Sequence, residues 1–178
     1  MTATGRSENA TVDYPGMDEG AEGIPTKDRA TQMIEINKAY AQCFMDGDFD
    51  GMLNHLVDEP VFEIFPPAVR ITGREAVRER SKRLYPMASQ NDTRTAQSHR
   101  ITASTAGEDV LIHEFSNLYT LPDGSVRRCY TVAVVPFEGD KMVGERVYSD
   151  QHLGRLREQL LGEDFFARSD VTLLGGRD

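Results

Sequence analysis

Three long runs of alternating apolar and polar residues, separated by tight turns, occupy the second half of the 178-residue chain. They cover residues 110–121, 125–137 and 142–150, and the turn sequences between them are Pro-Asp-Gly and Glu-Gly-Asp. Both turns contain the glycine that hairpin loops need for a positive φ. Because connections this short join antiparallel neighbours, the pattern predicts a β-meander, with a less clearly marked strand at 99–105.

Helical periodicity marks the first half of the chain instead. Apolar residues recur at steps of three and four from residue 27 to Gly47, which predicts a helix that this glycine ends. Asp48 can cap a second, short helix that forms a hairpin with the first. A strand is expected at 60–65, and the Pro66-Pro67 pair should end it because proline cannot donate to a sheet ladder.

Two more helices complete the predicted elements. Thr72 and Glu75 form a capping box that opens a helix at 73–84, and residues 151–161 are amphipathic. Helices packed on one face of a mainly antiparallel sheet make the fold class α+β.

The domain boundaries follow from composition. Residues 1–25 carry Arg6 against five acidic side chains and little that could pack, so a flexible acidic tail is expected there. One folded domain is predicted at 26–162, followed by a C-terminal tail at 163–178.

Charge and cysteine usage exclude several classes of function. A net charge of −9 opposes binding to nucleic acid, and no apolar run approaches the length of about 20 residues that spans a bilayer. Without a leader-like start, the sequence predicts a soluble, cytoplasmic protein. Two distant cysteines and four scattered histidines lack the spacing of a metal site or a disulfide framework, so no metal is expected.

Three local stretches are similar to sequence motifs of a known superfamily. They are residues 39–50, with Tyr40 seven positions before Gly47, residues 72–77, and residues 144–150. In this order and spacing the chain resembles the SnoaL-like branch of the nuclear-transport-factor-2-like superfamily. The resemblance implies a cone-shaped fold around a pocket for a small apolar organic ligand, no cofactor, and a homodimer formed through the outer face of the sheet.

The resemblance also implies site residues. Tyr40 falls where ketosteroid isomerases carry the tyrosine that donates to the developing oxyanion. The general base of those enzymes falls at Ile64, with Glu63 beside it as a reserve acid or base that a bulge could turn inward. Their second acid falls near Val132 or Ala133, while the last-strand aspartate of the polyketide cyclase falls at Val147.

Glu114 is the first candidate for catalysis among the strand residues. Pairing with limonene epoxide hydrolases places Glu114, Ser116 and Val147 at their catalytic positions, and a carboxylate in an apolar cavity suits proton transfer. Alternatively, Glu114 forms a cross-strand ion pair with Arg127 or Arg128. His113 is expected on the face opposite Glu114, with a surface or dimer role as its alternative.

Two functions from different classes remain open. One is a cofactor-free isomerase, cyclase or dehydratase of an apolar carbonyl compound, such as a polyketide or terpenoid, with Glu114 as base and Tyr40 as hydrogen-bond donor. The other is a noncatalytic binding protein of the same fold. A group of fourth-strand residues is expected to line the substrate pocket, with a solvated or interface face as the alternative for the first three: Arg127, Cys129, Thr131 and Ala133.

Overall fold

The computed structural model describes residues 27–88, 99–120 and 123–175, so the predicted acidic tail at 1–25 lies outside the described residues. Along the chain the elements are α1 (Lys27–Asp46), α2 (Phe49–Leu53), β1 (Leu56–Phe65), β2 (Val69–Thr72), α3 (Arg74–Ala88), β3 (His99–Ala106), β4 (Val110–Thr120), β5 (Val126–Glu138), β6 (Lys141–Ser149), α4 (Gln151–Leu161), α5 (Glu163–Phe166) and β7 (Val171–Leu173).

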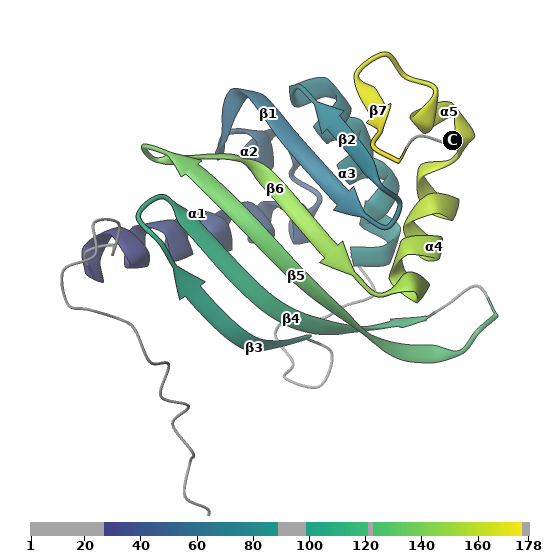
Figure 1. Ribbon diagram of the computed structural model, residues 1–178, viewed down its shortest axis with the longest axis horizontal. Helices are drawn as coiled ribbons and strands as arrows, with labels where there is room; N and C mark the ends of the chain where they lie inside the picture. The colour runs from purple at the N-terminus through teal and green to yellow at the C-terminus, as the bar shows by residue number, and fades with distance from the viewer. Residues whose placement is uncertain (1–26, 89–98, 121–122, 176–178) are drawn as a thin grey trace, which may run out of the picture.

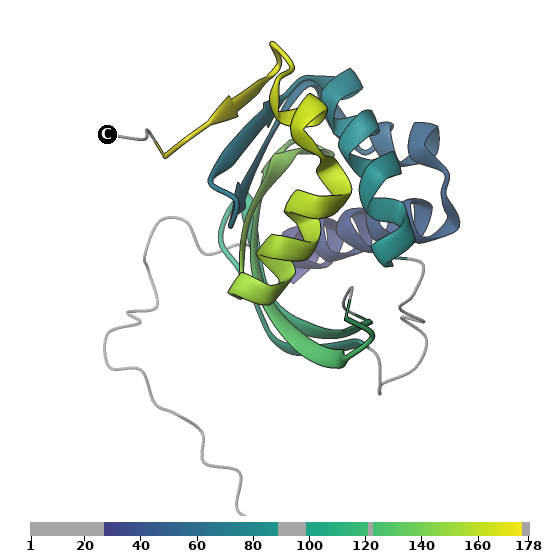
Figure 2. The same cartoon turned by 90° about the vertical axis from the view of Figure 1, so that its right-hand side faces the viewer.

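The described strands form one curved sheet of seven strands in the order β3-β4-β5-β6-β1-β2-β7. All neighbours pair antiparallel except β1 and β6, which run parallel. The predicted meander is therefore confirmed as β3 to β6, and the α+β class with it. Figures 1 and 2 show the sheet curving around α1, α3 and α4, which pack against its concave face.

The core lies between that concave face and the helices. Large side chains with no measurable exposure fill it, among them Met33 from α1, Phe62 from β1 and Leu153 from α4. Asp48 and Asp150 accept backbone N–H groups and so cap α2 and α4, as helix N-termini require. In the described part of the chain, no helix is both long and apolar enough to cross a bilayer.

Four features differ from the sequence expectations. β1 begins at Leu56 rather than at residue 60, and the four-residue strand β2 follows where only a turn was predicted. α3 continues past Pro86 to Ala88. The segment beyond Gly162, expected to be a tail, contains α5 and β7, and β7 pairs with β2 to extend the sheet.

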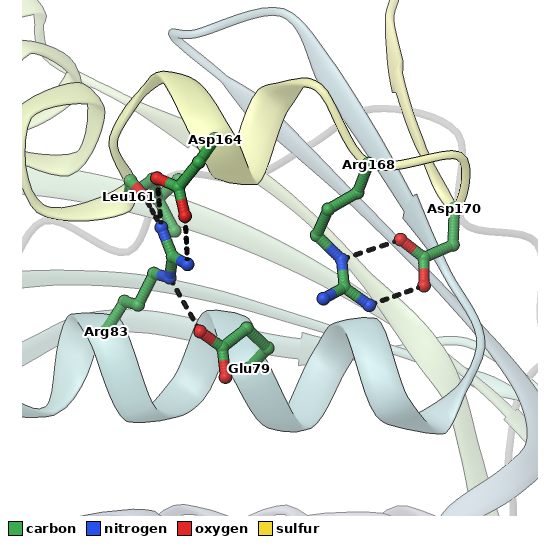
Figure 3. Close-up of polar contacts among 6 residues, drawn as sticks. All are labelled: Glu79, Arg83, Leu161, Asp164, Arg168 and Asp170. Atoms are coloured by element: carbon green, nitrogen blue, oxygen red, sulfur yellow. Dashed lines mark hydrogen bonds and ion pairs between the residues drawn. The ribbon is translucent and has the colours of Figure 1, made fainter.

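Arginine side chains form the ion pairs that connect this C-terminal segment to α3 and stabilise the segment itself (Figure 3). Arg83 of α3 donates to both carboxylate oxygens of Asp164 at 2.8 and 2.6 Å, to Glu79 at 2.8 Å, and to the carbonyl oxygen of Leu161. Arg83 thereby joins α3 to the end of α4 and the start of α5, so the end of α4 is fixed relative to α3.

Candidate functional site

A cavity of about 670 Å³ lies between the concave face of the sheet and the helices. Its wall is formed by α1, α3 and α4 on the helical side, and by β3, β4, β5 and β6 on the sheet side. This volume falls in the range of small-molecule sites. Most of the wall is apolar, so the few polar groups that face the cavity decide what it can bind.

Glu145 of β6 is the carboxylate on the cavity wall. Burial raises its pKa, and the cations Arg80 and Arg157 oppose that rise. Among the described residues, no ion pair within 4.0 Å joins Glu145 to either arginine. A carboxyl group whose pKa is raised can both accept and return a proton near neutral pH, which is the requirement for general acid/base catalysis.

Tyr40 of α1 faces the same cavity and is 5% exposed. Burial raises the pKa of its hydroxyl, as does the nearby Glu145, so it remains a neutral phenol. Arg80 of α3 lies near Tyr40, where it opposes the rise in the pKa of the hydroxyl, and its guanidinium lies 5.0 Å from the centre of the Phe62 ring.

Arg157 of α4 is the second buried cation of the wall. Its Nη1 donates to the Oγ of Ser149 at 2.7 Å. Burial lowers the pKa of Arg157 to about 10, with a smaller contribution from the like charge of Arg80. At neutral pH the guanidinium is still protonated, so two buried positive side chains, Arg80 and Arg157, lie near the Glu145 carboxylate on the described cavity wall, where Lys38 also lies but is exposed.

A second polar cluster lies where α1 meets β3 and β4. His113 Nε2 is 3.0 Å from the Asn37 amide nitrogen, and its Nδ1 is 2.9 Å from Ser104 Oγ. With the amide nitrogen donating, Nε2 accepts and Nδ1 donates, which is the neutral tautomer; burial lowers the pKa of His113 accordingly. Further along β4, the Asn117 amide donates to the Tyr119 hydroxyl at 3.0 Å.

The placement of Glu114 corrects the main expectation from sequence. Odd-numbered residues of β4, including His113 and Phe115, face the cavity, whereas Glu114 is exposed on the opposite face and accepts from the Thr102 hydroxyl at 2.7 Å. Ser116 lies on that outer face too, buried beneath Arg128, which donates to its Oγ at 3.1 Å. A shift of one residue in register exchanges the two faces of a strand, and the expected face was the wrong one.

The other predicted site residues divide into three groups. Ala133 and Val147 line the cavity as expected. Ile64, Cys129 and Thr131 are buried among the core side chains but are not part of the cavity wall.

Two charged candidates lie outside the cavity. Glu63 is held in a 2.6 Å ion pair by its cross-strand neighbour Arg70, so no bulge turns it inward. Arg127 is exposed near one end of β5, with its Nη1 3.2 Å from His152 Nε2.

Three residues of the polar wall were missed by the sequence analysis, although the sequence carries a signal for each. Glu145 lies two positions before Val147, so the alternation that puts Val147 inside puts Glu145 inside as well. Arg80 follows Val77 by three residues, and Arg157 follows Leu153 by four, which places both arginines on the apolar face of their helices. A charged residue in such a face is a candidate for a site.

The part of the chain that the structure describes contains no group of three or more His, Cys, Asp or Glu side chains placed to hold a metal ion. The chemistry that the described wall itself can supply is therefore proton transfer by Glu145, hydrogen-bond donation by Tyr40, and attraction of anions by the two arginines.

No family model and no curated protein sequence matches this chain. Solved structures do. An NTF2-like protein from Burkholderia xenovorans is 15% identical with a TM-score of 0.56, covering 72% of this chain and 97% of that one. An NTF2-like protein of unknown function from Cytophaga hutchinsonii is 17% identical with a TM-score of 0.53, covering 68% and 99%.

A third similar structure is a hypothetical protein with a ketosteroid isomerase-like fold from Catenulispora acidiphila, solved in complex with trimethylamine. It is 13% identical with a TM-score of 0.51, covering 64% of this chain and 84% of that one. At these identities the likeness establishes the fold, which is that of the NTF2-like and ketosteroid isomerase-like proteins. The narrower SnoaL-like assignment stays a prediction.

Proposed function

We propose that this protein is a cofactor-free enzyme of the isomerase, cyclase or dehydratase type that acts on a small carbonyl compound by acid/base catalysis. Glu145 is the group that accepts and returns the proton, and Tyr40 donates a hydrogen bond to the carbonyl oxygen. In this proposal Glu145 takes the role that the sequence analysis gave to Glu114.

The observation that carries the proposal is Glu145 itself, a carboxyl group with a raised pKa on the wall of a mostly apolar cavity. Water is a strong competitor for protons and hydrogen bonds, and an apolar wall reduces that competition. Tyr40 lies close enough to Glu145 for the carboxylate to influence its pKa. Acid and hydrogen-bond donor therefore face one volume.

In the proposed reaction, the Glu145 carboxylate removes a proton from the carbon next to the substrate carbonyl. The C–H bond breaks, an O–H bond forms on Glu145, and the electron pair moves to the carbonyl oxygen as an enolate. The Tyr40 hydroxyl donates to that oxygen, and the nearby positive charge of Arg80 helps to stabilise the negative charge that develops there. If the substrate carries a C=C bond beside the deprotonated carbon, the enolate is a dienolate; protonation by Glu145 at the far carbon of that double bond, with the electron pair moving from the enolate oxygen to re-form the C=O bond, completes an isomerisation.

The similarity to a trimethylamine complex supports binding of a small organic ligand in a fold of this kind. The homodimer and the cytoplasmic location that the sequence suggests stay predictions.

Proton exchange tests the proposal without knowledge of the natural substrate. The protein is incubated in D₂O with 2-tetralone and with 4-oxocyclohexanecarboxylate, and NMR follows the loss of the protons next to each carbonyl. We expect exchange faster than the buffer rate with at least one probe. Glu145→Gln should lower that rate by about 100-fold or more, because a positioned general base contributes 10² to 10⁴.

Glu138→Gln is the matched control, since this exposed residue at the end of β5 lies outside the cavity and should leave the exchange rate unchanged. Exchange that survives in Glu145→Gln but disappears in Glu114→Gln would overturn the assignment of the base. Absence of protein-dependent exchange with both probes would overturn the enzymatic proposal.

A noncatalytic binding protein is the second candidate, and one observation favours it. Ala133 and Val147 line the cavity at positions where, by the resemblance, relatives carry acidic groups. Under this alternative Glu145 orients a ligand and no bond changes. A ligand that is recovered chemically unchanged and undeuterated after long incubation would favour binding over catalysis.

A further inference from the structure

The charges buried at the cavity do not balance. Arg80 and Arg157 are 8% and 6% exposed, and both contribute to the cavity wall. Among the described residues of the wall, Glu145 supplies the one carboxylate. If Glu145 is ionised the excess is one positive charge, and if it is protonated the excess is two.

Part of the hydrogen-bonding capacity of these arginines is unused. The Nε atoms of Arg80 and Arg157 are buried and have no hydrogen-bond partner within the described residues. A buried guanidinium N–H without an acceptor is costly, because the group has lost water without replacement. Both arginines therefore retain a donor for a group that residues 27–88, 99–120 and 123–175 do not supply.

Asp150, a second carboxylate that acts on the pKa of Arg157, already has hydrogen-bond donors of its own. Asp150 raises the pKa of Arg157. Its oxygens, however, accept the backbone N–H group of Tyr130 on β5 at 2.9 Å, and those of His152 and Leu153 at the N-terminus of α4 at 2.9 and 3.0 Å. Those donors and the positive end of the helix stabilise the Asp150 charge where it is. It is therefore not the counterion that would satisfy the Arg157 Nε.

We propose that Arg80 and Arg157 form an anion subsite that binds the carboxylate of a small organic acid inside the cavity. A guanidinium presents N–H donors in a planar fork that matches the two oxygens of a carboxylate. One carboxylate neutralises the single excess charge that remains when Glu145 is ionised. The apolar wall, which includes Leu84 and Met87, receives the rest of the ligand. This inference rests on the proposed function only in naming its substrate as a carbonyl compound that carries an acid group.

The test measures binding and needs no turnover. Isothermal titration compares 2-naphthylacetate with its neutral amide, 2-naphthylacetamide, which has the same apolar body. We expect the unmodified protein to bind the acid about tenfold or more tightly than the amide. Hydrogen bonds to a charged group are stronger than those to a neutral group, and the difference in free energy corresponds to about this factor in affinity. This comparison does not depend on any variant being folded.

Variants then locate the subsite. Arg157→Gln should reduce the preference for the acid to about twofold or less, whereas Arg155→Gln should retain it. Arg155 is the matched control because it lies on the same helix, is exposed, and is not part of the cavity wall. An equal affinity of the unmodified protein for acid and amide, a failure to bind the acid, or an equal loss in both variants would overturn the proposal.

A third ligand tests the charge of the anion. Naphthalen-2-ylmethylphosphonate carries up to two negative charges, and we expect it to bind more weakly than the acid because, with Glu145 ionised, it exceeds the one positive charge that Arg80 and Arg157 have left. Tighter binding of the phosphonate would replace the carboxylate assignment. Arg157-dependent binding of the acid without any proton exchange would support the anion subsite and refute the enzymatic proposal. Proton exchange on 2-tetralone without a preference for the acid would support the enzymatic proposal and refute the anion subsite.

Discussion

Gly144 of β6, the residue before Glu145, shows how closely the cavity wall is built. Its φ is 149°, a value that residues with a side chain rarely adopt. An added Cβ would overlap the carbonyl oxygen of Val61 on β1 and lie 2.6 Å from the carbonyl carbon and 3.0 Å from the nitrogen of that residue. All three are backbone atoms, so no change of rotamer relieves the overlap. Gly144→Ala should therefore push β1 away from β6.

The cost can be worked from this contact. Val61 and Gly144 are partners in the parallel ladder, so separating them weakens about two backbone hydrogen bonds, at about 1 kcal/mol each. Overpacking adds about 1 to 3 kcal/mol. The expected loss of unfolding free energy is about 3 to 5 kcal/mol, which lowers the Tm by about 6 to 20 °C in a chain of this size.

Gly139→Ala is the control for the backbone term alone. Gly139 has a φ of 57° in the turn between β5 and β6, and nothing lies within 4 Å of the Cβ that alanine would add. It should cost about 1 to 2 kcal/mol, the penalty of the left-handed conformation. Urea denaturation followed by circular dichroism measures both. If Gly144→Ala loses no more stability than Gly139→Ala, the described approach of β1 to β6 is wrong.

Two further predictions concern charge. Burial raises the pKa of Glu145 above its ordinary 4.5, so the folded protein retains this proton to higher pH than the unfolded chain, and stability falls as the pH rises from 4.5 through the raised value. Urea denaturation across that window should show Glu145→Gln gaining stability relative to the unmodified protein, and parallel pH profiles would refute it. In thermal melts, Arg83→Gln should lower the Tm more than Arg168→Gln, because Arg83 joins α3 to Asp164 whereas Arg168 pairs with Asp170 two residues away; equal shifts would contradict this reading of Figure 3.

The order of the main elements could be predicted from the sequence because their signals are local. α4 has the predicted bounds of 151–161, since its amphipathic face begins directly after a capping aspartate. β2 and β7 were not predicted, because strands of four and three residues are too short for an alternation to be recognised. These strands form because the fold places β2 beside β1 and β7 beside β2, where each finds a strand to pair with.

The candidate site could be predicted only where a residue is anchored by its distance from a recognisable feature. Tyr40 was found from its spacing to Gly47, which ends α1. Glu114 was placed on the wrong face because β4 carries apolar residues on both, with Ile112 among the even positions and Leu111 among the odd ones. Which face meets the helices is decided by the pairing with β5 and by the packing of α1, and neither can be read from one strand.

The sheet order also fixes when during synthesis the site can first exist. β1 has β6 as its parallel neighbour, and Arg157 follows β6 on α4, so Tyr40 and Arg80 leave the ribosome long before the far wall of their cavity is made. A nascent chain therefore cannot complete the wall of this cavity until α4, almost the last helix, has emerged. Ligand added to a translation reaction should accordingly protect completed chains from proteolysis while leaving ribosome-bound intermediates as sensitive as before.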